Sequence, residues 1–135
     1  MPLNLSTLNK TLRMTREARG LTLEQIAGKA GLDLSTISRL EREPRDARAS
    51  SLVKLADALE VSVAFLLGHE DYDLEFPVAL RRQALRRFLS GVTYDDQQKR
   101  HFEELCFLDS APNTVRGWQD LTQNVTFLQT HKALD

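Results

Sequence analysis

Apolar residues in the first half of the chain recur at the spacing of amphipathic helices, in five separate segments. The first carries the stripe Leu5, Leu8 and Leu12, with Ala18 as a further candidate, and ends at Gly20. The other four follow residues that often cap a helix N-terminus: Thr22, Asp33, Ser50 or Ser51, and Ser62. Glycine or proline ends three of them: Gly31, Pro44 and Gly68. The pattern therefore predicts five helices before residue 70.

The second half begins with an acidic stretch, His69–Glu75, which has no apolar period and is interpreted as a linker or a short ordered hinge. Three helical segments follow, with expected starts at Pro77, at Asp95 or Asp96, and at Asn113 or Thr114. Their apolar stripes are Leu85, Phe88 and Leu89; Phe102, Leu105 and Cys106; and Trp118, Leu121, Val125 and Leu128. Because no segment alternates as a strand does, the sequence predicts an all-α protein with helical domains at residues 1–70 and 71–135.

Composition adds little to this picture, but the local placement of charge adds more. The chain has 135 residues, is 41% hydrophobic and 27% charged, and carries a net charge of −1, so composition alone does not indicate nucleic-acid binding. Arginines nevertheless recur every third residue on and after the third predicted helix: Arg39, Arg42, Arg45 and Arg48. Acidic residues stand between them, so this ridge fits either a DNA-facing surface or a solvated mixed-charge face.

Several other classes of function find no pattern in the sequence. The one cysteine, Cys106, cannot form an internal disulfide, and the N-terminus does not resemble a secretory signal. No apolar run approaches the roughly 18 residues of a membrane span, so we expect a cytoplasmic protein without membrane contact. The three histidines are scattered, which predicts no metal and no cofactor. No phosphate-binding loop or catalytic motif is present, so we expect no catalytic residues and no enzyme activity.

The segment Leu21–Glu43 carries the functional signal. Two helices joined by a very short turn need a small residue where they meet and a positive φ at the turn, which Ala27 and Gly31 supply. Ile26, Ile37 and Leu40 are spaced to form a shared core. The outward side of the second helix is then left to Leu34, Ser35, Ser38 and Arg39, and a helix of this kind fits the DNA major groove.

Leu21–Gly68 resembles the XRE (Cro-type) family of phage-repressor helix-turn-helix domains. The turn glycine, the helix spacing and the trailing pattern SLVKLADALEVSVAFLLG at Ser51–Gly68 carry this resemblance. It implies a five-helix, lambda-repressor-like domain that binds double-stranded DNA, with Leu34, Ser35, Ser38 and Arg39 facing the bases. The implied phosphate contacts are Arg13, Arg16, Thr22, Gln25, Arg42, Arg45 and Arg48.

Alternatives remain for two of these arginines, since Arg39 could pair with Glu43 and Arg16 with carbonyls near Gly20. The chain also departs from the family pattern at two places. Leu23 stands where a glutamine is usual, so that contact is absent or passes to Gln25. Glu43 and Pro44 stand where a glycine is usual, so the loop that follows is expected to be shaped differently.

The second half is expected to supply a dimer contact, because one domain of this type reads too few base pairs for tight specific binding. The expected dimerisation residues are Phe88, Phe102, Leu105, Trp118, Leu121, Val125 and Leu128. A self-contained three-helix core is the alternative interpretation of the same residues. The function predicted on this basis is a homodimeric transcriptional repressor that binds a palindromic operator.

His101–Leu128 is also similar to the C-terminal region of the radiation- and desiccation-response repressor DdrO. The shared features are a helix ending in a leucine, a short loop with a proline, and a Gly-Trp helix, here Leu108, Pro112 and Gly117-Trp118. The resemblance implies inactivation by a zinc metallopeptidase of the IrrE, PprI or ImmA type that cuts between Leu108 and Asp109, although those repressors favour a basic residue after the leucine. The alternatives are an antitoxin that masks a toxin and a phage immunity repressor.

Overall fold

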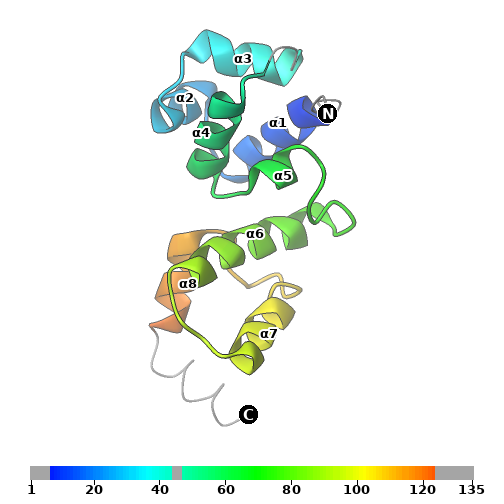
Figure 1. Cartoon of the computed structure of the whole chain (residues 1–135), viewed down its shortest axis with the longest axis vertical. Helices are drawn as coiled ribbons and strands as arrows, with labels where there is room; N and C mark the ends of the chain where they lie inside the picture. The colour runs from blue at the N-terminus through cyan, green and yellow to red at the C-terminus, as the bar shows by residue number, and fades with distance from the viewer. Residues whose placement is uncertain (1–6, 44–46, 124–135) are drawn as a thin grey trace. The chain divides into compact units, whose positions relative to one another are not determined.

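The computed structural model describes residues 7–43 and 47–123, and Leu5 and Pro44 of the predicted patterns lie outside them. These residues form eight helices and no strand, which confirms the predicted all-α class (Figure 1). The chain divides into two compact units, Met1–Leu74 and Glu75–Asp135. No helix in the described residues is long and apolar enough to cross a membrane.

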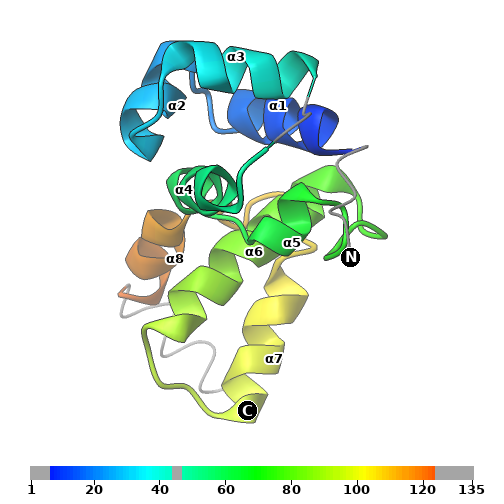
Figure 2. The same ribbon diagram turned by 45° about the horizontal axis from the view of Figure 1, so that its top comes forward.

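The first unit contains five helices: α1 (Leu8–Ala18), α2 (Leu23–Ala30), α3 (Leu34–Arg42), α4 (Ala49–Leu59) and α5 (Val63–Leu66). α1 packs against α3 and α5, while α2 packs against α3 and α4. Figure 2 shows α3 lying across α1 and α2 at the edge of this unit. The fold thus places one short helix where one of its sides meets solvent.

The core of this unit is formed by the apolar stripes that the sequence predicts. Its fully buried side chains include Leu8, Leu12, Ile26, Ile37, Leu40, Leu52, Leu55, Leu59 and Leu66. The expectation for Ala18 is wrong, because this residue is exposed at the last turn of α1. Thr15 takes the inward position instead, and its hydroxyl donates to the Thr11 carbonyl at 2.7 Å, so its polar atom is satisfied inside the core.

The helix ends follow the predicted signals with two differences. Ser62 caps α5 as expected, accepting a hydrogen bond from the Phe65 N–H at 2.9 Å. Asp33 takes the N-cap position of α3, but its side chain accepts no hydrogen bond from the described part of that helix. α4 begins at Ala49, before the expected Ser50 or Ser51, because Arg48 takes the N-cap position. The first N–H groups of α4 therefore have no side-chain cap among the described residues.

The second unit contains α6 (Phe76–Ser90), α7 (Asp96–Leu105) and α8 (Val115–Thr122), with α6 packed against both others. Its core contains Ala84, Leu85, Phe88, Phe102, Cys106 and Trp118. Phe102 joins the helices through edge-to-face contacts, with its ring centroid 6.4 Å from that of Phe88 and 6.1 Å from that of Trp118.

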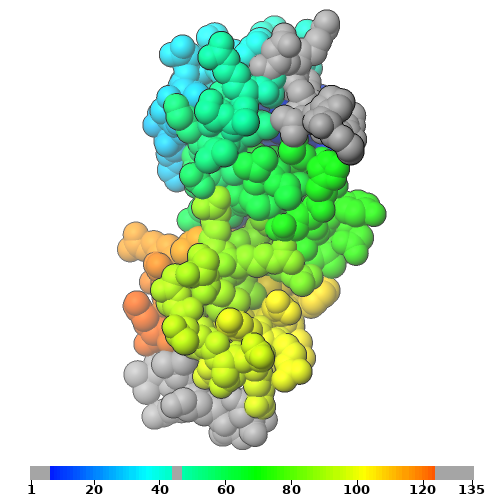
Figure 3. Space-filling view, in the orientation of Figure 1, coloured from blue at the N-terminus to red at the C-terminus, as the bar shows by residue number. Residues whose placement is uncertain are grey.

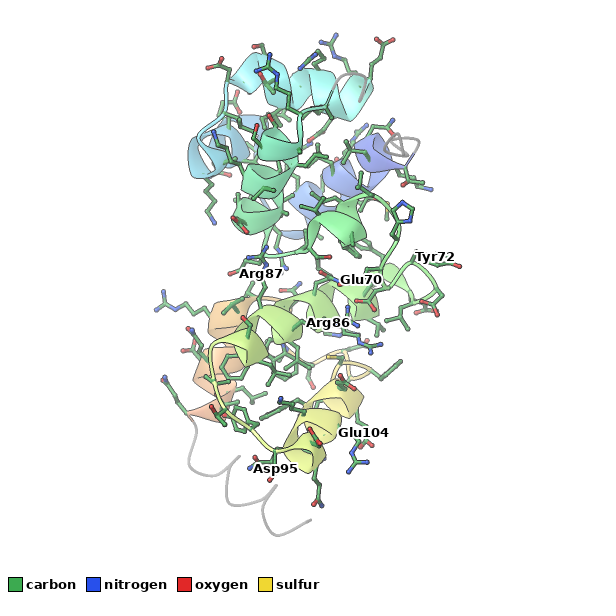
Figure 4. All side chains as sticks on the ribbon, viewed as in Figure 1. Glu70, Tyr72, Arg86, Arg87, Asp95 and Glu104 are labelled. Carbon is green, nitrogen blue, oxygen red and sulfur yellow. The ribbon has the colours of Figure 1, made fainter. Side chains whose placement is uncertain are left out.

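Polar caps begin the last two helices of the second unit, as predicted. Asp95, labelled in Figure 4, and Gln98 form a reciprocal capping box at the start of α7. Thr114 accepts a hydrogen bond from the Gly117 N–H at 3.0 Å at the start of α8. Gly117 also lets Pro112 approach closely, since a Cβ at this position would lie 2.6 Å from the Pro112 Cβ.

The acidic stretch His69–Glu75 is an ordered turn that leads into α6. Asp71 adopts a positive φ of 56°, and its carbonyl accepts a hydrogen bond from the Leu74 N–H at 3.2 Å. The Ser62 hydroxyl donates to Glu70 at 3.1 Å, which ties the turn to the start of α5. Tyr72 projects into solvent from the tip (Figure 4). Of the two interpretations of this stretch, a linker or a short ordered hinge, the structure supports the second.

Candidate nucleic-acid interface

The two sides of α3 differ sharply in burial. Ile37 and Leu40 are fully buried against the rest of the first unit. On the outer side, Ser35 and Arg39 are exposed, Ser38 is half-buried, and Leu34 is 42% exposed. In the space-filling view the cyan residues of α3 lie at the surface (Figure 3). All four predicted base-facing residues are thus accessible on one unit, and the apolar side holds the helix in place.

The turn before α3 has the predicted geometry. Gly31 adopts a left-handed conformation with φ of 67°, and the Leu32 N–H donates to the Ala27 carbonyl at 3.0 Å. This bond, with the one from the Gly31 N–H to the Gly28 carbonyl at 3.4 Å, satisfies the last carbonyls of α2 and reverses the chain within a few residues. Ala27 is 7% exposed where α2 meets the unit's core. The turn thereby fixes the angle at which α3 leaves α2.

A nearly buried ion pair joins α1 to α3. Arg16 Nε lies 2.6 Å from one carboxylate oxygen of Glu41 and Arg16 Nη2 lies 3.1 Å from the other, with 13% and 9% of the two side chains exposed. Arg16 Nη1 also donates to the Leu21 carbonyl at 2.8 Å, which bears out the expected contact with a carbonyl near Gly20. The hydrogen bond to Glu41 raises the pKa of Arg16, more than offsetting the opposing effect of desolvation.

This geometry argues against the predicted phosphate contact of Arg16. Three of its nitrogens already have acceptors, and a fork aimed at Glu41 cannot turn to a phosphate without leaving a carboxylate unpaired. The sequence reasoning missed Glu41, which lies 25 residues away from Arg16 in the chain. The pair instead fixes α3 against α1.

The other predicted phosphate ligands that the structure describes lie at the surface. Arg13 pairs with Glu17 one turn along α1 at 3.0 Å, but 67% and 55% of these side chains are exposed, so the pair is easily exchanged for another anion. Arg42 Nε makes a long 3.4 Å contact to the Ser38 carbonyl at the end of α3. Arg39 has no ion pair or hydrogen bond with any described residue, Glu43 included. Arg45 lies outside the described residues.

Thr22 and Gln25 cap α2 and still retain hydrogen-bond donors. Thr22 Oγ1 accepts from the Gln25 N–H at 3.1 Å, and Gln25 Oε1 accepts from the Thr22 N–H at 2.8 Å. Both contacts use the side chains as acceptors, so the threonine hydroxyl hydrogen and the glutamine NH₂ group can donate elsewhere. Both residues are exposed. The start of α2 can therefore offer donors and a positive helix end to one anion.

A groove of about 520 Å³ lies between α3 and the start of α4. Its lining includes three cations, Arg39, Arg48 and Lys54, one carboxylate, Asp33, and the hydroxyls of Thr36, Ser50 and Ser51. Because no described side chain caps α4, its first N–H groups add partial positive charge at this place. Sequence reasoning missed Lys54, although its spacing of four from Ser50 places both on one face of α4.

The predicted dimerisation residues lie inside the second unit. Phe88, Phe102 and Trp118 are buried in its core, and Leu105 and Leu121 are partly buried against it. Val125 and Leu128 lie outside the described residues. The described part of this unit therefore has the self-contained core that the sequence allowed as an alternative, and a role for these residues in dimerisation stays a prediction.

The predicted cleavage bond lies in an exposed connection. Leu108 is 51% exposed and the Asp109 side chain fully so, in the turn that follows α7. Among the residues that the structure describes, no group of three or more His, Cys, Asp or Glu side chains could hold a metal ion.

Comparison with known families supports the helix-turn-helix interpretation of the first unit. A family model described as a helix-turn-helix matches residues 12–66, which span most of α1 to α5. This match supports the XRE-type resemblance of the first unit and, with it, a DNA-binding role. No curated protein and no solved structure matches the chain.

Proposed function

We propose that this chain, with its helix-turn-helix domain at residues 12–66, is a sequence-specific transcriptional repressor that reads double-stranded DNA with α3. The observation that carries the proposal is the asymmetry of α3, whose apolar side is buried while Leu34, Ser35, Ser38 and Arg39 stay accessible. A helix of this width fits the major groove, where each base pair presents a distinct pattern of donors and acceptors.

Arg39 is the strongest candidate for sequence discrimination. Its guanidinium can donate two hydrogen bonds to a guanine, a contact worth about 1–3 kcal/mol against other bases. It has no competing partner among the described residues, so binding DNA breaks no existing ion pair there. Ser35 and Ser38 can donate or accept and are less selective. Leu34 offers an apolar surface to a thymine methyl group.

Hydrogen-bond donors at the start of α2 and cations at the start of α4 support the phosphate contacts. Thr22 and Gln25 stand at the start of α2, whereas Arg48 and Lys54 stand beside the groove at the start of α4. Helix N-termini with free donors favour phosphate groups. These contacts position the recognition helix along the duplex and carry no sequence information themselves.

A homodimer on a palindromic operator completes the proposal. Two helix-turn-helix domains read half-sites about 10–10.5 bp apart, or a multiple of that spacing, which raises affinity and specificity. The second unit is the candidate for the dimer contact. Because Phe88, Phe102 and Trp118 pack with one another in the core, they would shape the contact from beneath rather than form its surface.

Selection of bound duplexes from a random library with the purified chain tests this function. We expect an enriched inverted repeat, and native mass measurement of the complex should give two chains per duplex. Failure to enrich any sequence would refute specific reading, whereas one chain per duplex would refute the dimer alone. A co-purified toxin would instead favour the antitoxin alternative.

A regulatory cut between Leu108 and Asp109 is supported by the exposure of both residues. A peptidase can reach this connection, and the cut would separate α8, which carries the fully buried Trp118, from α7. Incubation with a zinc metallopeptidase of the IrrE, PprI or ImmA type should yield a fragment ending at Leu108 and release the DNA. An uncut chain, or a cut chain that still binds DNA as a dimer, would reject this regulation.

A further inference from the structure

The connection between α7 and α8, residues 106–114, combines an exposed middle with buried flanks. Phe107 is 62% exposed and Leu108 is 51% exposed, whereas Cys106 before them and Trp118 after them are fully buried. Two large apolar side chains in water give the connection little hydrophobic stabilisation of its own. Apart from Ala111, which packs against the core, its conformation therefore depends on polar ties and on its two ends.

Arg81 of α6 supplies the polar tie at the upstream end. Its side chain is 8% exposed, and Arg81 Nε donates to the Cys106 carbonyl at 2.6 Å. Arg81 Nη2 lies 3.9 Å from Asp109 Oδ1, a loose ion pair within the connection. Cys106 is the C-cap of α7, so the guanidinium also lies at the negative end of that helix.

The same residue is tied to α8 through its backbone. Trp118 Nε1 donates to the Arg81 carbonyl at 3.4 Å. The downstream end of the connection is held separately, where Pro112 packs closely on Gly117. Between these two ends, backbone bonds from Leu108 N–H to the Leu105 carbonyl (2.9 Å) and from Ala111 N–H to the Leu108 carbonyl (3.0 Å) keep the chain in tight turns.

We propose that Arg81 is a positioning residue that holds the α7–α8 connection closed and so sets how often Phe107–Ala111 opens to an endopeptidase. A peptidase needs an extended stretch of chain, and the turns at Leu108 and Ala111 must break to provide it. Loss of the Arg81 bond to Cys106 removes the upstream tie while the downstream contact of Pro112 with Gly117 stays. The inference concerns the connection that the proposed function assigns to regulatory cleavage, but it requires neither that peptidase nor DNA.

Limited digestion of the full chain with chymotrypsin tests this role, because chymotrypsin cuts after residues such as Phe107 and Leu108. The rate of cutting follows the population of the open form when reclosing is fast. Arg81→Met keeps the apolar stem and removes the guanidinium. We expect cutting in this connection to accelerate by about tenfold or more, the factor expected for one charge-assisted hydrogen bond. Arg100→Met makes the same change at an exposed position of α7 and should leave the rate unchanged.

Hydrogen exchange separates this role from general support of the core. In Arg81→Met, exchange should accelerate at the Leu108 and Ala111 amides and stay unchanged at the Leu85 amide in the middle of α6. Equal acceleration at all three sites, or an unchanged cutting rate, would overturn the proposal. Should Arg81→Met fail to fold, Arg81→Lys keeps the charge but not the directed Nε donor, and an intermediate cutting rate is expected. Failure of the metallopeptidase to cut would refute the regulation and leave this result standing.

Discussion

The ion pair between Arg16 and Glu41 gives a quantitative test of how α3 is held. We consider Arg16→Met, Glu41→Met and the double variant, each of which keeps most of the apolar stem. Arg16→Met leaves the Glu41 carboxylate, with 9% of its side chain exposed, without its arginine. Glu41→Met leaves Arg16, with 13% of its side chain exposed, only the Leu21 carbonyl and the looser pair with Glu17 at 3.9 Å. Breaking one side of a buried pair costs about 3–5 kcal/mol, and the lower end applies here because this pair lies at the edge of the core.

The double variant leaves no unpaired charge, so its loss should be no larger than that of one single variant. The expected coupling energy is therefore about 3 kcal/mol or more. Arg13 and Glu17 provide the matched control within α1, since their exposed pair should give no more than about 0.5 kcal/mol. High salt should weaken the control coupling much more than the buried one.

Hydrogen exchange at the amides of Leu12 in α1 and Leu40 in α3 measures these losses within the first unit, without assuming that both units unfold together. The hydrogen bond to Glu41 raises the pKa of Arg16, so its stabilising charge is fully present below the ordinary arginine pKa. That contribution is lost only as the pH rises through the raised pKa, and it is equal at pH 6 and pH 9. A coupling energy no larger than that of the Arg13–Glu17 control would refute the conclusion that this pair fixes α3.

Three further predictions test the packing and the backbone conformation. Gly28→Ala should stabilise the chain by about 0.4–1 kcal/mol, because the exposed Gly28 has open space around it. Gly117→Ala should destabilise the chain by about 1–3 kcal/mol, because the new Cβ meets Pro112. Thermal unfolding should show melting temperatures shifted in opposite directions, and shifts of one sign would contradict the geometry. Gly31→Ala should lower the free energy of unfolding by about 1–2 kcal/mol through its positive φ alone. Gly31→Asn should lower it less in the same measurement, and equal losses would point to another cause. Trp118→Ala should cost about 3–5 kcal/mol in hydrogen exchange at the Phe102 amide, and a loss below that of Trp118→Phe would show that α8 does not support this core.

Much of the fold follows from local signals in the sequence. Apolar periodicity located the buried leucines of α1 and α4, and the caps at Thr22, Ser62 and Asp95 marked helix starts, because each signal depends on residues within one turn. The cap of α4 was expected two or three residues too late, at Ser50 or Ser51, because Arg48 gives no capping signal. Thr15 was missed because its burial depends on a hydrogen bond back to Thr11 that hydrophobicity does not record.

The candidate interface was predicted less evenly. The outward side of α3 could be deduced, since the turn at Gly31 and the buried Ile37 and Leu40 determine which residues are left over. The role of Arg16 could not, because its partner Glu41 comes close only once α1 crosses α3. Arg81 was missed for the same reason, since its contact with Cys106 joins residues 25 positions apart.

The central claim, that α3 reads bases through Arg39, is tested most directly by the ratio of the dissociation constants for random and for selected DNA. Arg39→Ala should lower this ratio about 5- to 150-fold, the equivalent of 1–3 kcal/mol of base discrimination. Arg48→Ala, beside the groove, should weaken binding to both DNAs alike and reduce the salt slope by about 1. An equal loss on both DNAs for Arg39→Ala, with the ratio unchanged, would contradict the account.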